Sequence, residues 1–195
     1  MSFASETHAG LDLLVCNAGG QFPSPAARMS RKGWDAVIET NLTGTFLCCR
    51  EAHAAGLKAS AHGAIVNVIA DMFNGFPGMA HTGAARSAVD NLTKSLALEW
   101  AEDGVRVNAV APGVIFSESA AANYPPGFLS SISSDLPTHR LGTPEEVSSA
   151  VCFLLSPAAR YISGATLRVD GGSSLYKRPA FAVAPHDSLP PIDAL

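Results

Sequence analysis

Polar residues whose side chains could take part in chemistry stand at the start of a helix-like stretch that runs from His81 to Ala101. Arg86 can supply a positive charge and two parallel hydrogen bonds, but an arginine does not exchange a proton near neutral pH. Thr82 can donate a hydrogen bond to an oxyanion, although its hydroxyl is too weak an acid to protonate an alkoxide. The pair therefore offers charge and donors without a proton source.

Other titratable residues of this stretch are weaker candidates. His81 titrates near neutrality, but it precedes the expected helix and is equally well explained as a loop residue. Asp90 and Lys94 have the spacing of a catalytic pair, yet eight residues along a helix place Asp90 about 12 Å and roughly 80° from Thr82. We interpret Asp90 and Lys94 as an exposed ion pair one helical turn apart.

The elements that must position these residues alternate between two kinds. Buried strands are expected within 11–20, 64–70, 105–112 and 164–172, and helices over 30–60, 81–104 and 143–157. This order predicts the α/β class, a doubly wound parallel sheet with helices on both faces. Ligands bind such sheets beyond the carboxyl ends of the strands, which here are Asn17-Ala18-Gly19, Ala70-Asp71 and Pro112-Gly113.

The remaining segments differ in character. Residues 113–142 are polar and broken by prolines, so a mobile covering loop with short helical pieces is expected. Thr143, followed by Pro144 and two glutamates, is predicted to cap the helix over 143–157. Residues 173–195 are expected to form an extended tail.

Length and composition limit the classes of protein to which the chain can belong. The 195 residues, 47% hydrophobic and 15% charged, suit one domain with a buried core. The net charge of -4 and the absence of any Lys/Arg run beyond two residues argue against nucleic acid as a partner. No apolar run approaches the ~20 residues of a membrane span, and the first ten residues lack the features of a signal peptide. We expect a soluble, intracellular protein.

The four cysteines, Cys16, Cys48, Cys49 and Cys152, lie in apolar runs and show no CxxC spacing. Cysteine in such runs usually behaves as a small buried hydrophobe. We therefore expect reduced thiols in the core and no metal site.

Four motifs of the sequence resemble those of one known protein family. NAGG (17–20), NLTGTF (41–46), NLTKSLALEWAEDGVRVNAVAPG (91–113) and VDGG (169–172) occur in the order and spacing of the short-chain dehydrogenase/reductase family. Three segments are most similar to the peroxisomal trans-2-enoyl-CoA reductase branch of this family: GGQFPSPA, APGVIFSES and PEEVSSAVCFLLSPAA. No glycine-rich phosphate-binding turn lies near residue 1. The resemblance therefore implies an N-terminally truncated Rossmann-like domain over 1–172, followed by the tail.

The resemblance also implies site residues. It places the cofactor, expected to be NADP(H), against Asn17, Ala18, Gly19, Arg86, Pro112, Gly113 and Ser117. It gives Asn41 the task of holding a proton-relaying water. In its register Thr82 stands at the family's tyrosine, Arg86 at its lysine and Ala70 at its serine.

Because all three positions differ from the family pattern, ordinary ketone or alcohol chemistry is disfavoured. Reduction of a trans-2-enoyl-CoA thioester is expected instead, since charge then gathers on the thioester oxygen, where Thr82 and backbone amides could donate. The α-carbon proton would come from water or from Asp71. Two alternatives stay open: a short-chain reductase of another carbonyl, and a non-catalytic fragment that joins full-length copies.

Partners and compartment follow from the same resemblance. An acyl-CoA is the expected substrate, and the helix from His81 to Ala101 is expected to build a homodimer or homotetramer together with the helix 33–55. The compartment is cytoplasmic or peroxisomal, although the terminal Asp193-Ala194-Leu195 is a poor match to the Ser-Lys-Leu signal with its basic middle residue.

Overall fold

Four parallel strands form the centre of the molecule. The computed structural model describes residues 10–118 and 127–175. In this part β1 (Leu13–Cys16), β2 (Ala64–Val68), β3 (Arg106–Pro112) and β4 (Thr166–Val169) pair in chain order. All three pairings are parallel, so the carboxyl ends of the strands gather at one edge of the sheet. The predicted parallel sheet is confirmed.

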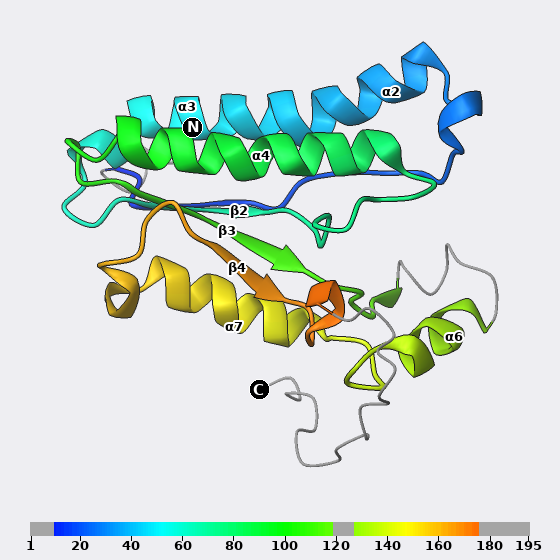
Figure 1. Cartoon of the computed structure of the whole chain (residues 1–195). Helices are drawn as coiled ribbons and strands as arrows, with labels where there is room; N and C mark the ends of the chain where they lie inside the picture. The colour runs from blue at the N-terminus through cyan, green and yellow to red at the C-terminus, as the bar shows by residue number, and fades with distance from the viewer. Residues whose placement is uncertain (1–9, 119–126, 176–195) are drawn as a thin grey trace.

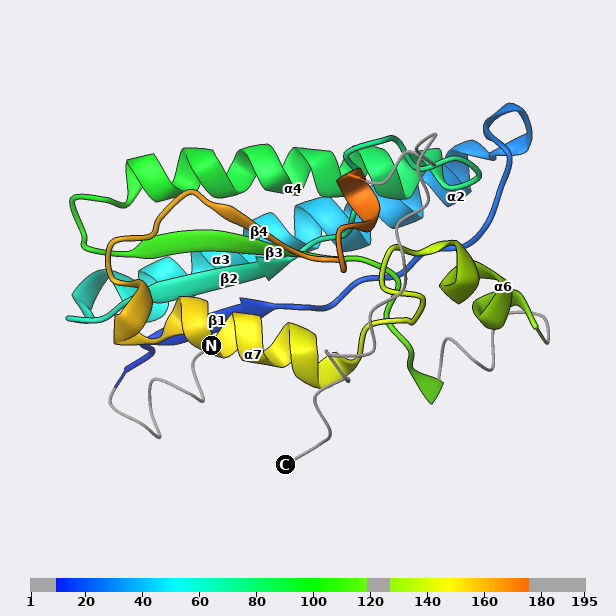
Figure 2. The same ribbon diagram turned by 60° about the horizontal axis from the view of Figure 1, so that its bottom comes forward.

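Helices cover both faces of the sheet (Figure 1). One face carries α2 (Arg31–Ile38), α3 (Gly44–Ala55) and α4 (Ala80–Glu99), and the other carries α7 (Pro144–Leu155), as the turned view also shows (Figure 2). The short α6 (Phe128–Asp135) lies beyond the carboxyl ends of the strands. This arrangement confirms the predicted α/β layers.

The strand residues alternate between the two helical layers. Ile65 and Val107 pack with Leu96 of α4, whereas Val66 and Val110 pack with Leu154 of α7. All four strand residues are fully buried. A run of apolar residues without alternation is what a strand buried on both faces requires, so the sheet is held from both sides.

The helix expected over 30–60 is not continuous. Between α2 and α3 the chain makes a π-helical turn, Glu39–Thr43, and a 3-10 turn, Leu57–Ala59, follows α3. A π-turn inserts one residue into the helical ladder and often marks a functional position. Here it contains Asn41, which is fully buried.

Two expectations about burial and the tail are wrong. Cys16 and Cys49 are buried, but Cys48 and Cys152 are exposed; all four are free thiols. Ser173–Leu175 is not extended but a short 3-10 helix. The Asp170 carboxylate closes it by accepting hydrogen bonds from the amides of Gly172 and Ser174, both at 3.0 Å. The rest of the expected tail, 176–195, lies outside the described residues.

The covering segment is described only in part. It contains α6, as short helical pieces were expected, and residues 119–126 lie outside the described residues. Gly142 pairs with the start of the segment by accepting from Phe116 N at 2.9 Å and donating to Val114 O at 3.0 Å. Both ends of the segment are therefore tied together next to β3.

The start of α7 confirms the predicted cap. Thr143 Oγ1 accepts from Glu146 N, and the Glu146 carboxylate accepts from Thr143 N at 2.9 Å, which completes a capping box. Glu146 also receives two hydrogen bonds from Arg140, at 2.9 and 2.7 Å. These bonds hold the pKa of Glu146 below its usual 4.5, with the Arg140 hydrogen bonds as the largest cause.

Glu146→Gln is therefore expected to lower the free energy of unfolding at pH 7 by about 1.5–3 kcal/mol, the range for hydrogen bonds to a charged group. A carboxylate with a depressed folded pKa stabilises the fold above its unfolded value and loses this effect as pH falls through the folded value. The gap between the two proteins should thus close below pH 4.5. Urea unfolding across pH measures it. Glu145→Gln, in the same first turn, is the control; an equal loss there would contradict the assignment.

Candidate functional site

The loop after β1 is fixed by one buried amide. Asn41 donates to Gly20 O at 2.7 Å and to Val37 O at 2.9 Å, and accepts from Gly20 N at 3.3 Å. Both amide hydrogens are therefore used by protein carbonyls. The structure gives Asn41 the work of clamping the loop, and this differs from the expected water-holding role.

Arg86 lies against the same loop. Its Nη1 donates to Val68 O, at the carboxyl end of β2, at 3.1 Å. A Cβ added to Gly19 would overlap the Arg86 guanidinium and lie 2.7 Å from Asn41 Oδ1. Gly19, Asn41 and Arg86 therefore meet at one point, where only a residue without a side chain fits.

The positive charge of Arg86 is not neutralised by any carboxylate of the described residues. It is half-buried, and burial lowers its pKa, although an arginine stays protonated in proteins. Within 10–118 and 127–175 no carboxylate forms an ion pair with it. Donors that lie at the strand ends without a protein anion are suited to a ligand oxygen, and the cofactor role of Arg86 stays a prediction.

Thr82 is placed differently from the expectation. Its amide donates to His81 Nδ1 at 2.8 Å, its hydroxyl lies 3.2 Å from the same nitrogen, and the residue is 1% exposed. The hydroxyl thus faces the protein interior. A direct donor role toward substrate is not supported by this geometry.

His81 was expected before the helix but lies in its first turn, fully buried. Because Nδ1 accepts an amide hydrogen, the ring is neutral with its hydrogen on Nε2. Nε2 has no partner among the described residues, and the ring meets Phe22 edge-on at 4.7 Å between centroids. His81 is therefore a packed support for Thr82 and makes no exposed acid.

A largely apolar cavity of about 530 Å³ adjoins the strand ends. Its lining includes Ala70 after β2, Gly113 after β3 and apolar side chains of the loops and α6: Pro23, Phe76, Met79, Ile115, Leu129 and Ile132. Gln21 contributes the one polar side chain of the described lining. The cavity fits an apolar group with a single polar atom near Gln21.

Asp71 does not line this cavity. Its carboxylate accepts from Ser173 Oγ at 3.1 Å, and Asn74 Nδ2 donates to Ser174 O at 2.6 Å. The loop after β2 is thus tied to the turn after β4. Ala70, the preceding residue, faces the cavity instead, since successive residues of an extended chain point to opposite sides. The geometry turns Asp71 away from a role as proton donor.

The other expected cofactor residues follow the same edge. Asn17 and Ala18 are exposed in the loop after β1, and Ser117 is half-buried after β3. Gly113 comes directly after Pro112 and lies next to the end of β4. A Cβ added to Gly113 would be 2.9 Å from Asp170 Cα. The structure therefore brings these residues to the carboxyl edge of the sheet, as predicted.

Asp90 and Lys94 form the predicted ion pair, with half of the Lys94 side chain exposed. Asp90 also accepts a hydrogen bond from Thr166. This second contact ties α4 to β4, which the sequence did not indicate. Among the described residues no group of three His, Cys, Asp or Glu side chains could hold a metal, and no helix has the length and apolar character to cross a membrane.

Comparison with known proteins decides the family. Residues 1–174 match the family described as Enoyl-(Acyl carrier protein) reductase. The chain is 39% identical over 173 residues to the probable 2,4-dienoyl-CoA reductase of Bacillus subtilis, with 87% of this chain and 68% of that protein covered. The chain belongs to the short-chain dehydrogenase/reductase family.

Other members of the short-chain dehydrogenase/reductase family are equally similar. The 3-oxoacyl-[acyl-carrier-protein] reductase of Synechocystis is 42% identical over 170 residues, covering 85% of this chain and 66% of that protein. The glucose 1-dehydrogenase of Gluconobacter oxydans is 39% identical over 170 residues, covering 86% and 64%. Family membership is thus clear, while the relatives' names differ in substrate, and the chain spans about two thirds of each relative's length.

Solved structures of the family show the same fold. The citronellol catabolism dehydrogenase of Pseudomonas aeruginosa gives a TM-score of 0.76 at 43% identity, covering 89% of this chain and 66% of that one. A variant of ElxO with NADPH bound gives 0.82 at 31% identity, covering 90% and 72%. The predicted Rossmann-like fold is confirmed.

Sequence reasoning missed two features of the site. Gln21 lies in no periodic element, and its place in the cavity wall depends on how the loop after β1 folds back. The contact of Gly19 with Arg86 joins residues 67 positions apart, so no local pattern signals it. The only sequence sign was the double glycine of the Asn-Ala-Gly-Gly loop.

Proposed function

We propose that the chain binds NADPH and serves the reduction of the carbon–carbon double bond of a trans-2-enoyl-CoA thioester. One observation carries the proposal: at the strand ends Arg86 forms no ion pair with a carboxylate of the described residues, while Thr82, at the position of the family's tyrosine, is buried against His81. In this part of the chain the site thus has donors and charge, and no titratable side chain lines its apolar cavity.

The residues fit a nicotinamide cofactor. Arg86 lies at the carboxyl edge of the sheet with donors left over, and the Gly19 backbone packs so closely on its guanidinium that a Cβ would overlap it. These are features of a site for sugar hydroxyls approached closely by backbone. When bound, NADPH supplies the hydride. The solved relative with NADPH supports the choice of this cofactor.

Gln21 is the proposed donor to the substrate. Conjugate reduction places negative charge on the thioester oxygen, and a donor aimed there lowers the barrier. Gln21 brings the only side-chain amide to the described cavity lining, and the apolar walls suit the acyl chain. Because no titratable side chain lines the described cavity, the α-carbon proton is assigned to water.

NADPH consumption with crotonyl-CoA and longer trans-2-enoyl-CoAs tests the reaction, with acetoacetyl-CoA as the carbonyl control. The proposal expects turnover of enoyl-CoAs only. Turnover of acetoacetyl-CoA alone would favour carbonyl reduction instead. If neither substrate reacts but the chain co-purifies with a longer short-chain reductase, the non-catalytic alternative holds.

Arg86→Ala is expected to raise the NADPH dissociation constant about tenfold or more, since a hydrogen bond from a charged group is worth about 1.5–3 kcal/mol. Arg86→Lys should lose less, because it keeps the charge. Fluorescence titration with NADPH measures both. Arg31→Ala, which removes an 88% exposed side chain, is the control. An unchanged constant for Arg86→Ala would remove Arg86 from the cofactor site.

Gln21→Leu, close to glutamine in volume, is expected to lower kcat by about 100-fold while NADPH binding stays the same, as removal of one oxyanion donor does. Gln21→Asn, which keeps the amide on a shorter stem, should retain part of the activity. Steady-state kinetics with crotonyl-CoA separates kcat from KM. Equal kcat for the leucine variant and the parent protein would exclude the donor role.

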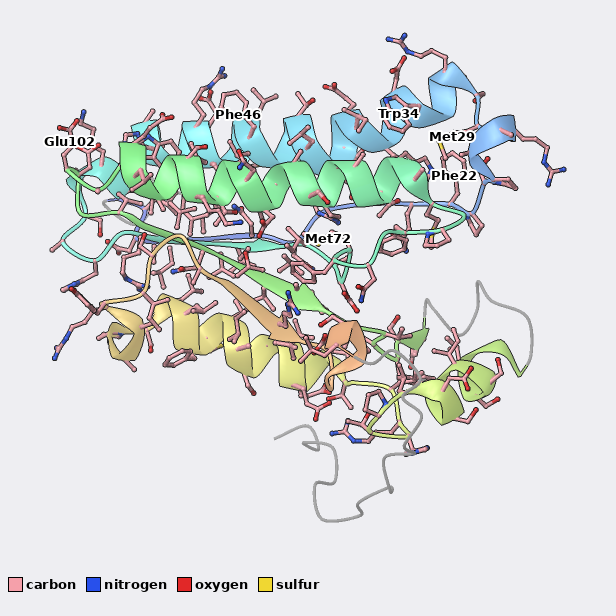
Figure 3. The ribbon with its side chains drawn as sticks, viewed as in Figure 1. Phe22, Met29, Trp34, Phe46, Met72 and Glu102 are labelled. Carbon is pink, nitrogen blue, oxygen red and sulfur yellow. The ribbon has the colours of Figure 1, made fainter. Side chains whose placement is uncertain are left out.

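We also propose that copies of the chain associate through α2 and α3. Trp34, Phe46 and Leu47 are each more than one third exposed on these helices, and Figure 3 shows Trp34 and Phe46 on their outer side. Covering these apolar side chains with a second copy would remove their surface from water, which favours association. Light scattering that reports a monomer at micromolar concentration would contradict this.

A further inference from the structure

Two buried thiols face each other behind the loop after β1. Cys16 ends β1 and Cys49 lies in α3, and their Sγ atoms are 3.8 Å apart. Cys49 Sγ also lies 3.5 Å from Asn67 Oδ1, a second acceptor for its single hydrogen. A disulfide needs about 2.05 Å, so side-chain rotation with a small shift of the strand end would bring the two sulfurs together.

We propose that Cys16 and Cys49 are a peroxide-sensitive pair that forms a reversible disulfide. Hydrogen peroxide oxidises the Cys16 thiolate to a sulfenic acid, and this step releases hydroxide, which takes up the thiol proton as water. Cys49 sulfur then attacks the Cys16 sulfur, the S–O bond breaks, and a second water leaves. The two thiols lose two electrons and two protons in total, and the peroxide takes these up to become two waters.

The surroundings favour Cys16 as the first thiol to react. A hydrogen bond from Cys49 lowers the pKa of Cys16, and the thiolate is the reactive form. Cys16 is 8% exposed whereas Cys49 is fully buried, so a molecule as small as peroxide meets Cys16 first. The exposed Cys48 is a poorer competitor, because partial burial raises its pKa.

The disulfide would act on the cofactor loop. Cys16 is joined directly to Asn17, and Asn41 anchors Gly20 on the other side of the loop. Drawing Cys16 toward α3 therefore strains the loop between two fixed points and shifts Gly19 relative to Arg86. This consequence rests on the proposed NADPH site, whereas the disulfide itself does not.

The experiment uses the full chain with Cys48→Ser and Cys152→Ser, which leaves only the inferred pair. After treatment with hydrogen peroxide the intact mass should fall by two hydrogens, and dithiothreitol should restore it. Tryptic digestion without reductant should join residues 1–28, with Cys16, to residues 33–50, with Cys49. The same protein with Cys16→Ser in addition is the control that cannot cross-link.

The outcomes separate the two proposals. A gain of oxygen without the joined peptide would overturn the disulfide. A joined peptide accompanied by an NADPH dissociation constant at least about tenfold higher, reversed by dithiothreitol, supports the pair as a switch; an unchanged constant would overturn the switching role. If the reduced protein never binds NADPH but the joined peptide forms, the proposed function fails and the disulfide stands.

Discussion

Gly19→Ala is expected to weaken the proposed NADPH binding by about 5- to 150-fold while the protein still folds. The new methyl group would overlap the Arg86 guanidinium and come within 2.7 Å of Asn41 Oδ1. Arg86 has a long side chain that can move, so the protein relieves the overlap by displacing the guanidinium from Val68 O. Overpacking of this kind costs about 1–3 kcal/mol. Most of this free-energy cost therefore reduces ligand binding, and little of it reduces the stability of the fold.

The adjacent glycine provides a matched control. A Cβ at Gly20 would meet no atom within 4 Å, so Gly20→Ala should bind NADPH as the parent protein does. Fluorescence titration and thermal unfolding of both variants separate binding from stability. If the two alanines weaken binding equally, loop flexibility and not the Arg86 contact controls the site.

Arg106→Met is expected to cause the largest loss of stability, about 3 kcal/mol or more, because hydrogen bonds from a charged group are worth about 1.5–3 kcal/mol each. Arg106 donates from the start of β3 to four carbonyls: Leu154 at 2.7 Å, Leu155 at 3.2 Å, and Ser156 and Ile162 at 3.4 Å. Three of these carbonyls end α7, where no helical partner exists. Methionine fills the space but leaves them unpaired.

Urea unfolding measures the change, and the unfolding midpoint temperature should fall by roughly 2–4 °C per kcal/mol for a chain of this size. Arg160→Met removes an exposed arginine close to the same turn and should change the free energy of unfolding by less than about 0.5 kcal/mol. A similar loss for both variants would mean that net charge, and not the carbonyl contacts, determines the effect.

The sequence predicts the fold well because its signals are local. The apolar runs of the strands and the Thr143 cap depend on neighbours in the chain, and the structure confirms them. The start of α4 was misjudged by one residue at His81, because no capping residue precedes it: Met79 makes no side-chain cap. The π-turn at Asn41 was missed since a one-residue insertion barely disturbs hydrophobic spacing.

The candidate site is predicted less completely than the fold. Strand-end residues were found because parallel strands must bring their carboxyl ends together. The directions in which their side chains point were not predicted, because these directions depend on tertiary partners. Thr82 turns to His81 and Asp71 turns to Ser173, while Gln21 lines the cavity. Each outcome is decided by residues far along the chain or by a single rotamer.

The pairing of the strands in chain order has a consequence for how the molecule assembles. Every strand of the described sheet docks onto the strand that was synthesised just before it, so the sheet can grow in one direction as the chain leaves the ribosome. No later segment has to insert between two strands already paired. The carboxyl edge, with its loops after β1, β2 and β3, is therefore laid down in order, and the turn after β4 locks the loop after β2 only when the last strand arrives.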